Sequence, residues 1–131
     1  MKEYLFTTSL ETRDYECDLQ GVINNANYQH YLEYTRHKWL QSRGQSFKQW
    51  HEKGIDAMVS EINIKYRNAL HGQETMLSCL NLHREGARFI FEPDIYRKAD
   101  MKLCIQATVT IVSVVNGRLS KGDEIAFLLE S

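Results

Sequence analysis

The sequence has 131 residues, of which 43% are hydrophobic, and a formal net charge of -1 at neutral pH. This length fits one domain with a single core, and no stretch rich in proline, glycine or serine divides it. The near-neutral charge excludes a general attraction to nucleic acid or anionic lipid, although it permits a local basic patch. We therefore expect one domain over residues 1–131 that binds neither nucleic acid nor membranes.

The cysteines and the N-terminal segment indicate a reducing compartment. The three cysteines, Cys17, Cys79 and Cys104, are odd in number and lack a CxxC or metal-binding spacing, so a disulfide framework is not expected. The opening MKEYLFTTS lacks the hydrophobic run of a signal peptide. No apolar stretch approaches the ~20 residues that a membrane span needs. We expect a cytoplasmic protein.

The first part of the chain predicts a strand, a turn and the longest helix. Residues 4–13 are rich in β-formers, and a turn follows at residues 18–21. Apolar residues then recur at three- and four-residue spacing, which collects them on one stripe of a helix. The stripe contains Tyr28, Tyr31, Leu32, Thr35, Trp39 and Leu40, and polar residues, including Arg36, lie between these positions. Asn24, Asn25 or Asn27 can cap the helix start, and Gly44 suits a left-handed cap at its end.

The remainder predicts a short helix and four strands. Residues 46–53 indicate the helix, and residues 57–67 alternate as a half-exposed strand with Met58, Ile62, Ile64 and Tyr66 on one face. Further strands are expected at 75–84, 88–97 and 102–115, and a short helix is expected near the C-terminus. Pro93 marks an edge strand or a bulge. The turns are too short for crossovers, so we expect an α+β fold with a mainly antiparallel sheet.

The chemistry of the turn and helix start favours acyl transfer. Asp18 lies just ahead of the helix, where free N–H groups can polarise a carbonyl oxygen while a carboxylate acts on the carbonyl carbon or on a water. The alternative is that Asp18 is a turn residue and that the asparagines only cap the helix.

Other chemistries find little support in the sequence. The five histidines show no HExxH pair or comparable metal spacing, so no metal is expected. No serine lies in a GxSxG elbow, and no glycine-rich phosphate loop is present. Cys17, beside Asp18, is the remaining candidate nucleophile.

Residues 16–36 resemble the signature of hotdog-fold thioesterases of the 4-hydroxybenzoyl-CoA group, roughly D-x-D-x-x-G-x-V-N/H-x-A-x-Y followed by a long helix with an arginine. The matching residues are Glu16, Asp18, Gly21, Ile23, Asn24, Ala26, Tyr28 and Arg36. With SFKQW and INIKYRNA, the chain is most similar to the branch that hydrolyses long-chain acyl-CoA. It departs from the family at Glu16, where aspartate is usual, at Asn25, where some relatives have histidine, and at Ala69, where proline is common.

The resemblance implies a curved sheet of about five strands wrapped around one long helix, and hydrolysis of a fatty or aromatic acyl-CoA without a cofactor. Asp18 would be the nucleophile or the general base, and the Asn25 amide would polarise the thioester carbonyl. Asn24 would fix the helix start and bind the substrate. Tyr28 would contact the substrate or serve only in the core. Arg84 and Arg88, near a hairpin, would bind coenzyme A phosphates or only protect a sheet edge.

The resemblance also implies a homodimer or homotetramer with the site at the subunit junction. No buried cation is evident in the sequence, so apolar acyl groups are expected to be preferred over dicarboxylic ones. The main alternative is a non-catalytic module that binds or senses acyl-CoA. A hotdog dehydratase or hydratase is less well supported, because such relatives use a histidine in the site segment and residues 15–28 contain none.

Overall fold

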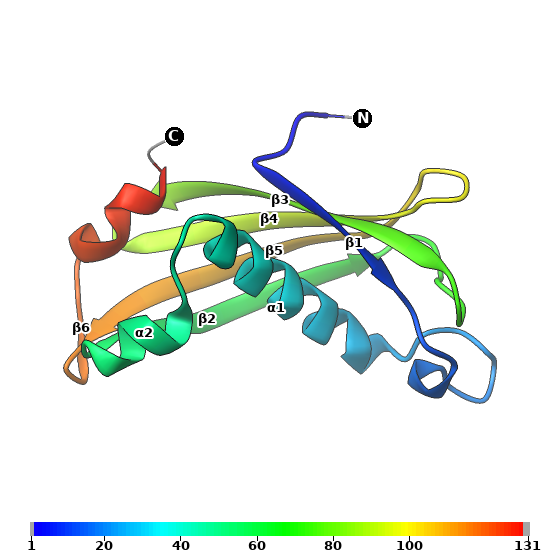
Figure 1. Ribbon diagram of the computed structural model, residues 1–131, viewed down its shortest axis with the longest axis horizontal. Helices are drawn as coiled ribbons and strands as arrows, with labels where there is room; N and C mark the ends of the chain where they lie inside the picture. The colour runs from blue at the N-terminus through cyan, green and yellow to red at the C-terminus, as the bar shows by residue number, and fades with distance from the viewer. Residues whose placement is uncertain (1, 130–131) are drawn as a thin grey trace.

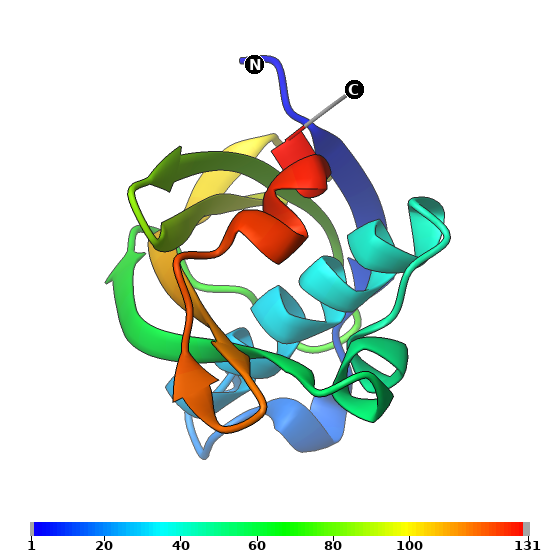
Figure 2. The same cartoon turned by 90° about the vertical axis from the view of Figure 1, so that its left-hand side faces the viewer.

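One curled antiparallel sheet packs around one long helix in the computed structural model, which describes residues 2–129. The strands lie in the order β1-β3-β4-β5-β2, with β6 added beside β5. Their bounds are β1 (Phe6–Glu11), β2 (Ile55–Tyr66), β3 (Thr75–Glu85), β4 (Arg88–Arg97), β5 (Lys102–Val115) and β6 (Arg118–Leu119). Figures 1 and 2 show the sheet curving around the helix α1 (Asn25–Ser42). The predicted α+β architecture is confirmed.

Three short helical segments complete the described chain. They are η1 (Asp14–Glu16) before the turn at Asp18, α2 (Phe47–Glu52) after α1, and η2 (Asp123–Leu129) near the C-terminus. In Figure 2, η2 lies across the end of the curled sheet that faces the viewer. Within residues 2–129, no helix is long and apolar enough to cross a membrane.

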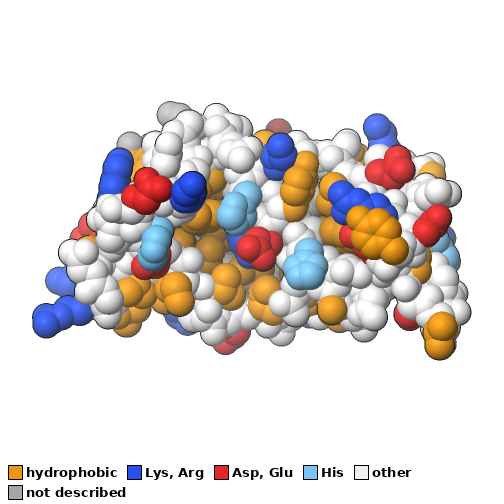
Figure 3. Space-filling view, turned by 60° about the horizontal axis from the view of Figure 1, so that its bottom comes forward, with side chains coloured by type: hydrophobic (Ala, Val, Ile, Leu, Met, Phe, Trp, Pro, Cys, Tyr) orange, Lys and Arg blue, Asp and Glu red, His pale blue; other side chains and the backbone are white. Residues whose placement is uncertain are grey.

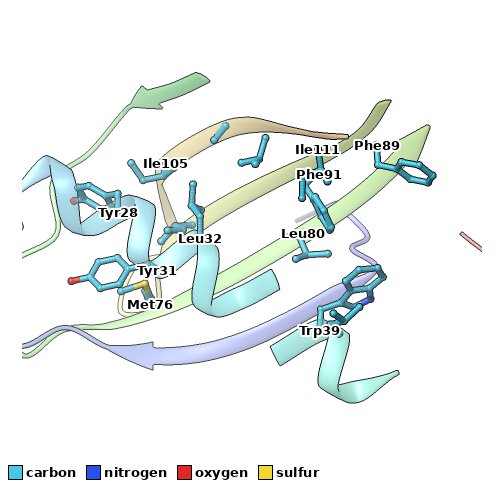
Figure 4. Packing of buried hydrophobic residues seen from close by; sticks show 14 of the residues in the cluster. Tyr28, Tyr31, Leu32, Trp39, Met76, Leu80, Phe89, Phe91, Ile105 and Ile111 are labelled. Carbon is cyan, nitrogen blue, oxygen red and sulfur yellow. The ribbon is translucent and has the colours of Figure 1, made fainter. Parts of the chain in front are cut away.

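The core lies between α1 and the concave face of the sheet. The predicted apolar stripe of α1 is buried, and its aromatic side chains meet those of the strands, as between Trp39 and Phe91 at 5.6 Å between ring centroids. Figure 4 shows this packing along the length of the helix. On the side of α1 toward β3, the buried hydroxyls of Thr35 and Ser78 lie 2.6 Å apart.

The ends of α1 follow from its capping residues. The Asn24 side chain accepts a hydrogen bond from the Ala26 N–H at 3.0 Å, as an N-cap does. Gly44 adopts a φ of 72°, which glycine tolerates without a steric penalty, and the helix stops before it.

Two strand predictions were partly wrong. The register between β2 and β5 shifts between Val59 and Glu61, so Met58 pairs with Val112 whereas Ile62 pairs with Val109. Residues 109 and 112 of one strand point to opposite faces, so the bulge separates Met58 from the face of Ile62. Pro93 lies in β4, which pairs on both sides and is not an edge strand; the register shift in β4 follows it, between Ile95 and Tyr96.

The strand β2 forms one edge of the sheet. Within the described residues it pairs only with β5, which leaves the backbone groups on its other side without a strand partner over 12 residues. Met58, Val59 and Tyr66 on this strand are large hydrophobic residues with roughly half of their surface exposed. Such an edge is prone to pair with another chain.

Candidate active site

Asp18 lies in a tight exposed turn at one end of the molecule. Its Oδ1 accepts hydrogen bonds from the N–H groups of Gln20 (2.8 Å) and Val22 (3.4 Å), and its own N–H donates to the Val22 carbonyl (2.9 Å). Its Oδ2 accepts no hydrogen bond from residues 2–129, so this oxygen is available to a water or a substrate. Oδ1 therefore stabilises the turn, while Oδ2 remains open for a chemical role.

Glu16 fastens this turn to the long helix. The Tyr31 hydroxyl donates to Glu16 Oε1 at 2.7 Å, and the Arg13 amide donates to the same oxygen at 2.8 Å. Burial alone would raise the pKa of Glu16, but these hydrogen bonds and the Arg13 guanidinium outweigh burial and hold the pKa below its usual range. The Glu16 backbone carbonyl also accepts from Asn24 N–H and from the Asn27 side chain. Glu16 is thus a structural residue of the site.

The turn at Asp18 and the start of α1 are held side by side. Cys17 and Ile23 form an antiparallel bridge, and Ile23 N–H donates to the Leu70 carbonyl at 2.8 Å. The N–H of Asn25 is the first of the helix, where no intrahelical acceptor exists, and Asn25 is exposed. The Asn25 amide, which can polarise a carbonyl, therefore lies two residues after Ile23, the residue that pairs with Cys17 of the Asp18 turn.

A groove of about 160 Å³ runs along this helix start. It is lined by Val22, Ile23, Asn25, Tyr28, Tyr66, Arg67, Asn68 and Ala69. Tyr28 is buried at its floor, where its hydroxyl accepts from the Leu70 N–H at 3.2 Å and its ring meets Tyr66 edge-on at 5.7 Å. Burial raises the pKa of Tyr28, which keeps its phenol neutral. Tyr28 therefore serves both in the core and in the groove.

Two residues of the groove were not among the site residues predicted from the sequence. Arg67 is exposed and its Nη2 donates to Gln106 Oε1 at 3.1 Å, while the Asn68 side chain donates to the Leu103 carbonyl at 2.7 Å. Their place in the groove follows from the pairing of residues 22–23 with residues 70–71, which links distant parts of the chain. The INIKYRNA segment was the available signal, since Arg67 and Asn68 belong to it.

Arg84 and Arg88 lie at the opposite end of the molecule within one chain. Thr75, at the start of β3, pairs with Glu11 near the Asp18 turn, whereas Arg84 is near the end of β3. At about 3.3 Å per residue this separates Arg84 from the turn by roughly 30 Å. Arg84 also donates to the Gly86 and Lys121 carbonyls and pairs with Asp123 at 2.8 Å. Binding of coenzyme A by these two arginines stays a prediction that requires a second copy of the chain.

Arg36 departs from its expected position on the polar side of α1. It is only 7% exposed, and its buried Nη1 has no hydrogen-bond partner within residues 2–129. The expectation that no cation is buried was therefore wrong. Among residues 2–129, no three histidine, cysteine or acidic side chains gather as a metal site.

Comparisons with known proteins agree with this architecture. The sequence profile of the Thioesterase-like superfamily matches residues 12–126. A putative esterase of Aquifex aeolicus is 30% identical over 108 residues, which cover 76% of this chain and 84% of the relative. The chloroplastic acyl-acyl carrier protein thioesterase ATL3 of Arabidopsis thaliana is 29% identical over 75% of this chain, and the match covers 52% of ATL3, so the chain spans about half of that protein. The putative acyl-CoA thioesterase YneP of Bacillus subtilis is 28% identical over 80% of this chain and 76% of its own length.

Solved structures share the fold. The hypothetical protein AQ1494 of Aquifex aeolicus superposes with a TM-score of 0.87 at 20% identity, over 96% of this chain and 99% of that chain. A 1,4-dihydroxy-2-naphthoyl-CoA thioesterase from Synechocystis superposes with a TM-score of 0.84 at 17% identity, over 91% and 90%. The sheet wrapped around α1 is the predicted hotdog fold. With the profile match over most of its length, the chain belongs to the thioesterase-like superfamily.

Proposed function

We propose that this chain hydrolyses an acyl-CoA thioester with a fatty or aromatic acyl group in the groove at the start of α1. The observation that carries the proposal is the free Oδ2 of Asp18, in a turn that the Cys17–Ile23 bridge pairs with the segment leading into an 18-residue helix. A preorganised N–H group at such a helix end stabilises the oxyanion that forms when a thioester carbonyl is attacked. The family membership supports the same reaction.

The proposed reaction needs only this carboxylate, this amide and water. As a general base, Asp18 Oδ2 takes a proton from a water whose oxygen attacks the thioester carbon. The carbonyl oxygen becomes an oxyanion at the Asn25 N–H, and the C–S bond then breaks to give the acid and the thiolate, which takes up a proton. As a nucleophile, Oδ2 attacks the thioester carbon and expels the thiolate, which takes up a proton, to form an acyl anhydride that water hydrolyses in a second step. Label in Asp18 after a single turnover in ¹⁸O-water would identify this second route, because it requires attack of water on the Asp18 carbon of the anhydride.

The substrate class within this proposal rests on the resemblance and on the relatives. The SFKQW and INIKYRNA segments favour the long-chain branch, YneP is described as a putative acyl-CoA thioesterase, and ATL3 acts on acyl-acyl carrier protein. The test is release of free thiol from a panel of fatty acyl-CoA, aromatic acyl-CoA and acyl carrier protein thioesters. Turnover of any CoA ester well above the rate of an Asp18→Asn control supports the proposal. Tight binding of acyl-CoA without turnover would instead indicate a binding or sensing module.

We further propose that the functional unit is at least a dimer. The free edge of β2 carries exposed apolar residues, and Tyr66 on this strand also lines the groove. A second copy paired along β2 would satisfy the edge and close the groove from the side. Sedimentation should show a dimer or tetramer at micromolar concentration. A monomer that retains full turnover would contradict a shared site.

A further inference from the structure

Arg36 is a buried cation to which the described residues supply no hydrogen-bond partner. It is 7% exposed, and none of the hydrogen bonds or ion pairs among residues 2–129 involves its guanidinium. Glu33, one turn earlier on α1, interacts with Arg36 through its charge. The Glu33 side chain is 59% exposed, however, and lies 3.8 Å from His37. Burial therefore leaves the guanidinium without an acceptor and without a close countercharge.

Such an arrangement is unfavourable unless a partner is supplied from outside the described chain. Arginine stays charged in proteins, and a buried charge is tolerated when it is paired and hydrogen-bonded. Burial lowers the pKa of Arg36, and the Glu33 charge offsets only part of this effect. Because the ordinary pKa of arginine is far above neutral, the group stays protonated at neutral pH. A ligand that brings an acceptor and a negative charge would resolve the cost.

Arg36 lies on a side of α1 whose N-terminal part is exposed. Gln29, Glu33, Arg36 and Leu40 share one side of the helix, and along that side the first two are exposed while the last two are buried. The side is therefore open at the helix start and closes at Arg36. Figure 3 shows the face on which α1 and α2 lie, where hydrophobic side chains gather between scattered charged groups.

This side of α1 lies on the flank of the buried stripe away from Thr35 and β3. Thr35, on the other flank of the stripe, contacts Ser78 of β3, and the groove joins Asn25 at the start of α1 to Tyr66 at the end of β2. Helical side chains lean toward the helix N-terminus, and on this side of α1 the N-terminal residues Gln29 and Glu33 are the exposed ones. From residue 25 to residue 36 the helix rises about 16 Å, the length of an extended acyl chain of medium size.

We propose that Arg36 binds an anionic oxygen at the far end of the acyl group, which makes acyl thioesters with a distal carboxylate preferred substrates. The proposal rests on the thioesterase function above. A carboxylate supplies both the acceptor and the countercharge, and arginine binds it through two parallel hydrogen bonds. A plain hydrocarbon end supplies neither. The earlier expectation that apolar acyl groups are preferred over dicarboxylic ones assumed that no cation is buried, and Arg36 removes that assumption.

The test compares dodecanedioyl-CoA with dodecanoyl-CoA, which differ only in the distal carboxylate. The wild-type protein should have the higher kcat/KM for the dicarboxylic ester. Arg36→Met keeps a long unbranched side chain without the charge, and should lower the ratio of the two kcat/KM values roughly 10- to 100-fold. Arg36→Lys keeps the charge and should retain part of the preference. Lys38→Met, which removes an exposed cation from the same helix, is the matched control and should leave the ratio unaltered.

A binding measurement separates this inference from the proposed function. Free dodecanedioic acid should raise the melting temperature of the wild-type protein more than dodecanoic acid does, and Arg36→Met should abolish the difference. If this holds while neither ester is hydrolysed, the thioesterase proposal fails and the Arg36 site stands. If wild type and Arg36→Met have the same substrate ratio, the Arg36 proposal is wrong. If Arg36→Met dissociates the oligomer and slows both esters equally, the partner of Arg36 is a second copy of the chain.

Discussion

The two ends of the curled sheet use their polar groups in different ways. At the end near the β3–β4 hairpin, Arg84 bonds two carbonyl groups and Asp123 at 2.7–2.8 Å, and Glu124 accepts hydrogen bonds from Ser113 and Ser120. These contacts fasten η2 across the sheet. At the other end, Asp18 is exposed with one free oxygen, and the helix start at Asn25 is open to a groove.

The same contrast holds for apolar groups. At the closed end η2 buries Ile125 and Leu128 among aromatic side chains of α1, α2 and β4. At the open end the groove mixes the Tyr28 ring with polar Asn25, Arg67 and Asn68. Because one end uses its groups for packing and the other leaves them available, stability and activity should respond to substitutions at different ends.

The largest effect should come from Asp18→Asn at the open end. The change keeps the size and the turn hydrogen bonds of Oδ1 but removes the charge and basicity of Oδ2, so kcat should fall roughly 100- to 10,000-fold. The turn contact itself is worth about 1 kcal/mol at most, so the melting temperature should fall little. Both quantities should be measured on one preparation. Retention of more than about a tenth of the wild-type kcat would show that Asp18 is only a turn residue.

At the closed end, Ile125→Ala should give the reverse pattern. Ile125 is 2% exposed on the buried side of η2. Its loss removes buried surface and leaves a cavity, which should lower the free energy of unfolding by about 2–4 kcal/mol. Denaturant unfolding gives this value, and kcat at a permissive temperature should stay near that of wild type. The control is Phe127→Ala, on the same segment but 38% exposed, which should cost less. An Ile125→Ala protein of normal stability with low kcat would mean that the closed end takes part in the reaction.

Local sequence signals predicted most of the fold. The capping asparagine and Gly44 gave the limits of α1, and alternating residues gave the long strand β5 with the observed bounds. The face of Met58 was wrong because a one-residue bulge reverses the alternation, and no local pattern marks it. The burial of Arg36 did have a signal, since it lies four residues from both Leu32 and Leu40 on one side of the helix.

The site was less accessible from the sequence. The Asp18 turn and the helix start are neighbours in the chain, so their proximity could be predicted. The contribution of Arg67 and Asn68 could not, because it depends on the contact of Ile23 with Leu70, far apart in the chain. That Asp18 Oδ1 accepts hydrogen bonds within the turn while Oδ2 does not could not be predicted either, because it depends on the conformation of the turn.

A smaller effect is expected from Glu16→Gln, which tests whether Glu16 supports the open end rather than reacts there. The variant weakens the contacts to Tyr31 and Arg13, and should lower the free energy of unfolding by about 1–2 kcal/mol at neutral pH. Because folding lowers the pKa of Glu16, its stabilisation is complete above the unfolded pKa of about 4.3 and is lost as the pH falls through the folded value. The gap between wild type and variant should therefore close in acid. A collapse of kcat in Glu16→Gln with unaltered stability would mean that Glu16, two positions before Asp18, is the catalytic carboxylate of the family signature.

The smallest effect concerns the arginines at the closed end and tests whether a second copy joins the two ends. Arg88 is exposed and its only ion pair in the described chain, with Glu85, is long at 3.9 Å, so charge reversal there leaves the fold undisturbed. If a second copy brings the hairpin to the groove, Arg88→Glu should raise KM for acyl-CoA several-fold, since an exposed charge contact is worth about 1 kcal/mol at most. Arg84→Glu is a poorer probe because it also breaks the contacts to Lys121 and Asp123. The reference substrate is the acyl-pantetheine thioester, which lacks the nucleotide and should be affected less.

Arg67→Glu is the comparison within one chain, because Arg67 lines the groove directly. An increase in KM for Arg67→Glu alone would place the nucleotide at the open end and leave the closed end with a structural role only. An increase in KM for both Arg67→Glu and Arg88→Glu that weakens at high salt would show that the open end of one chain and the closed end of another bind one substrate together.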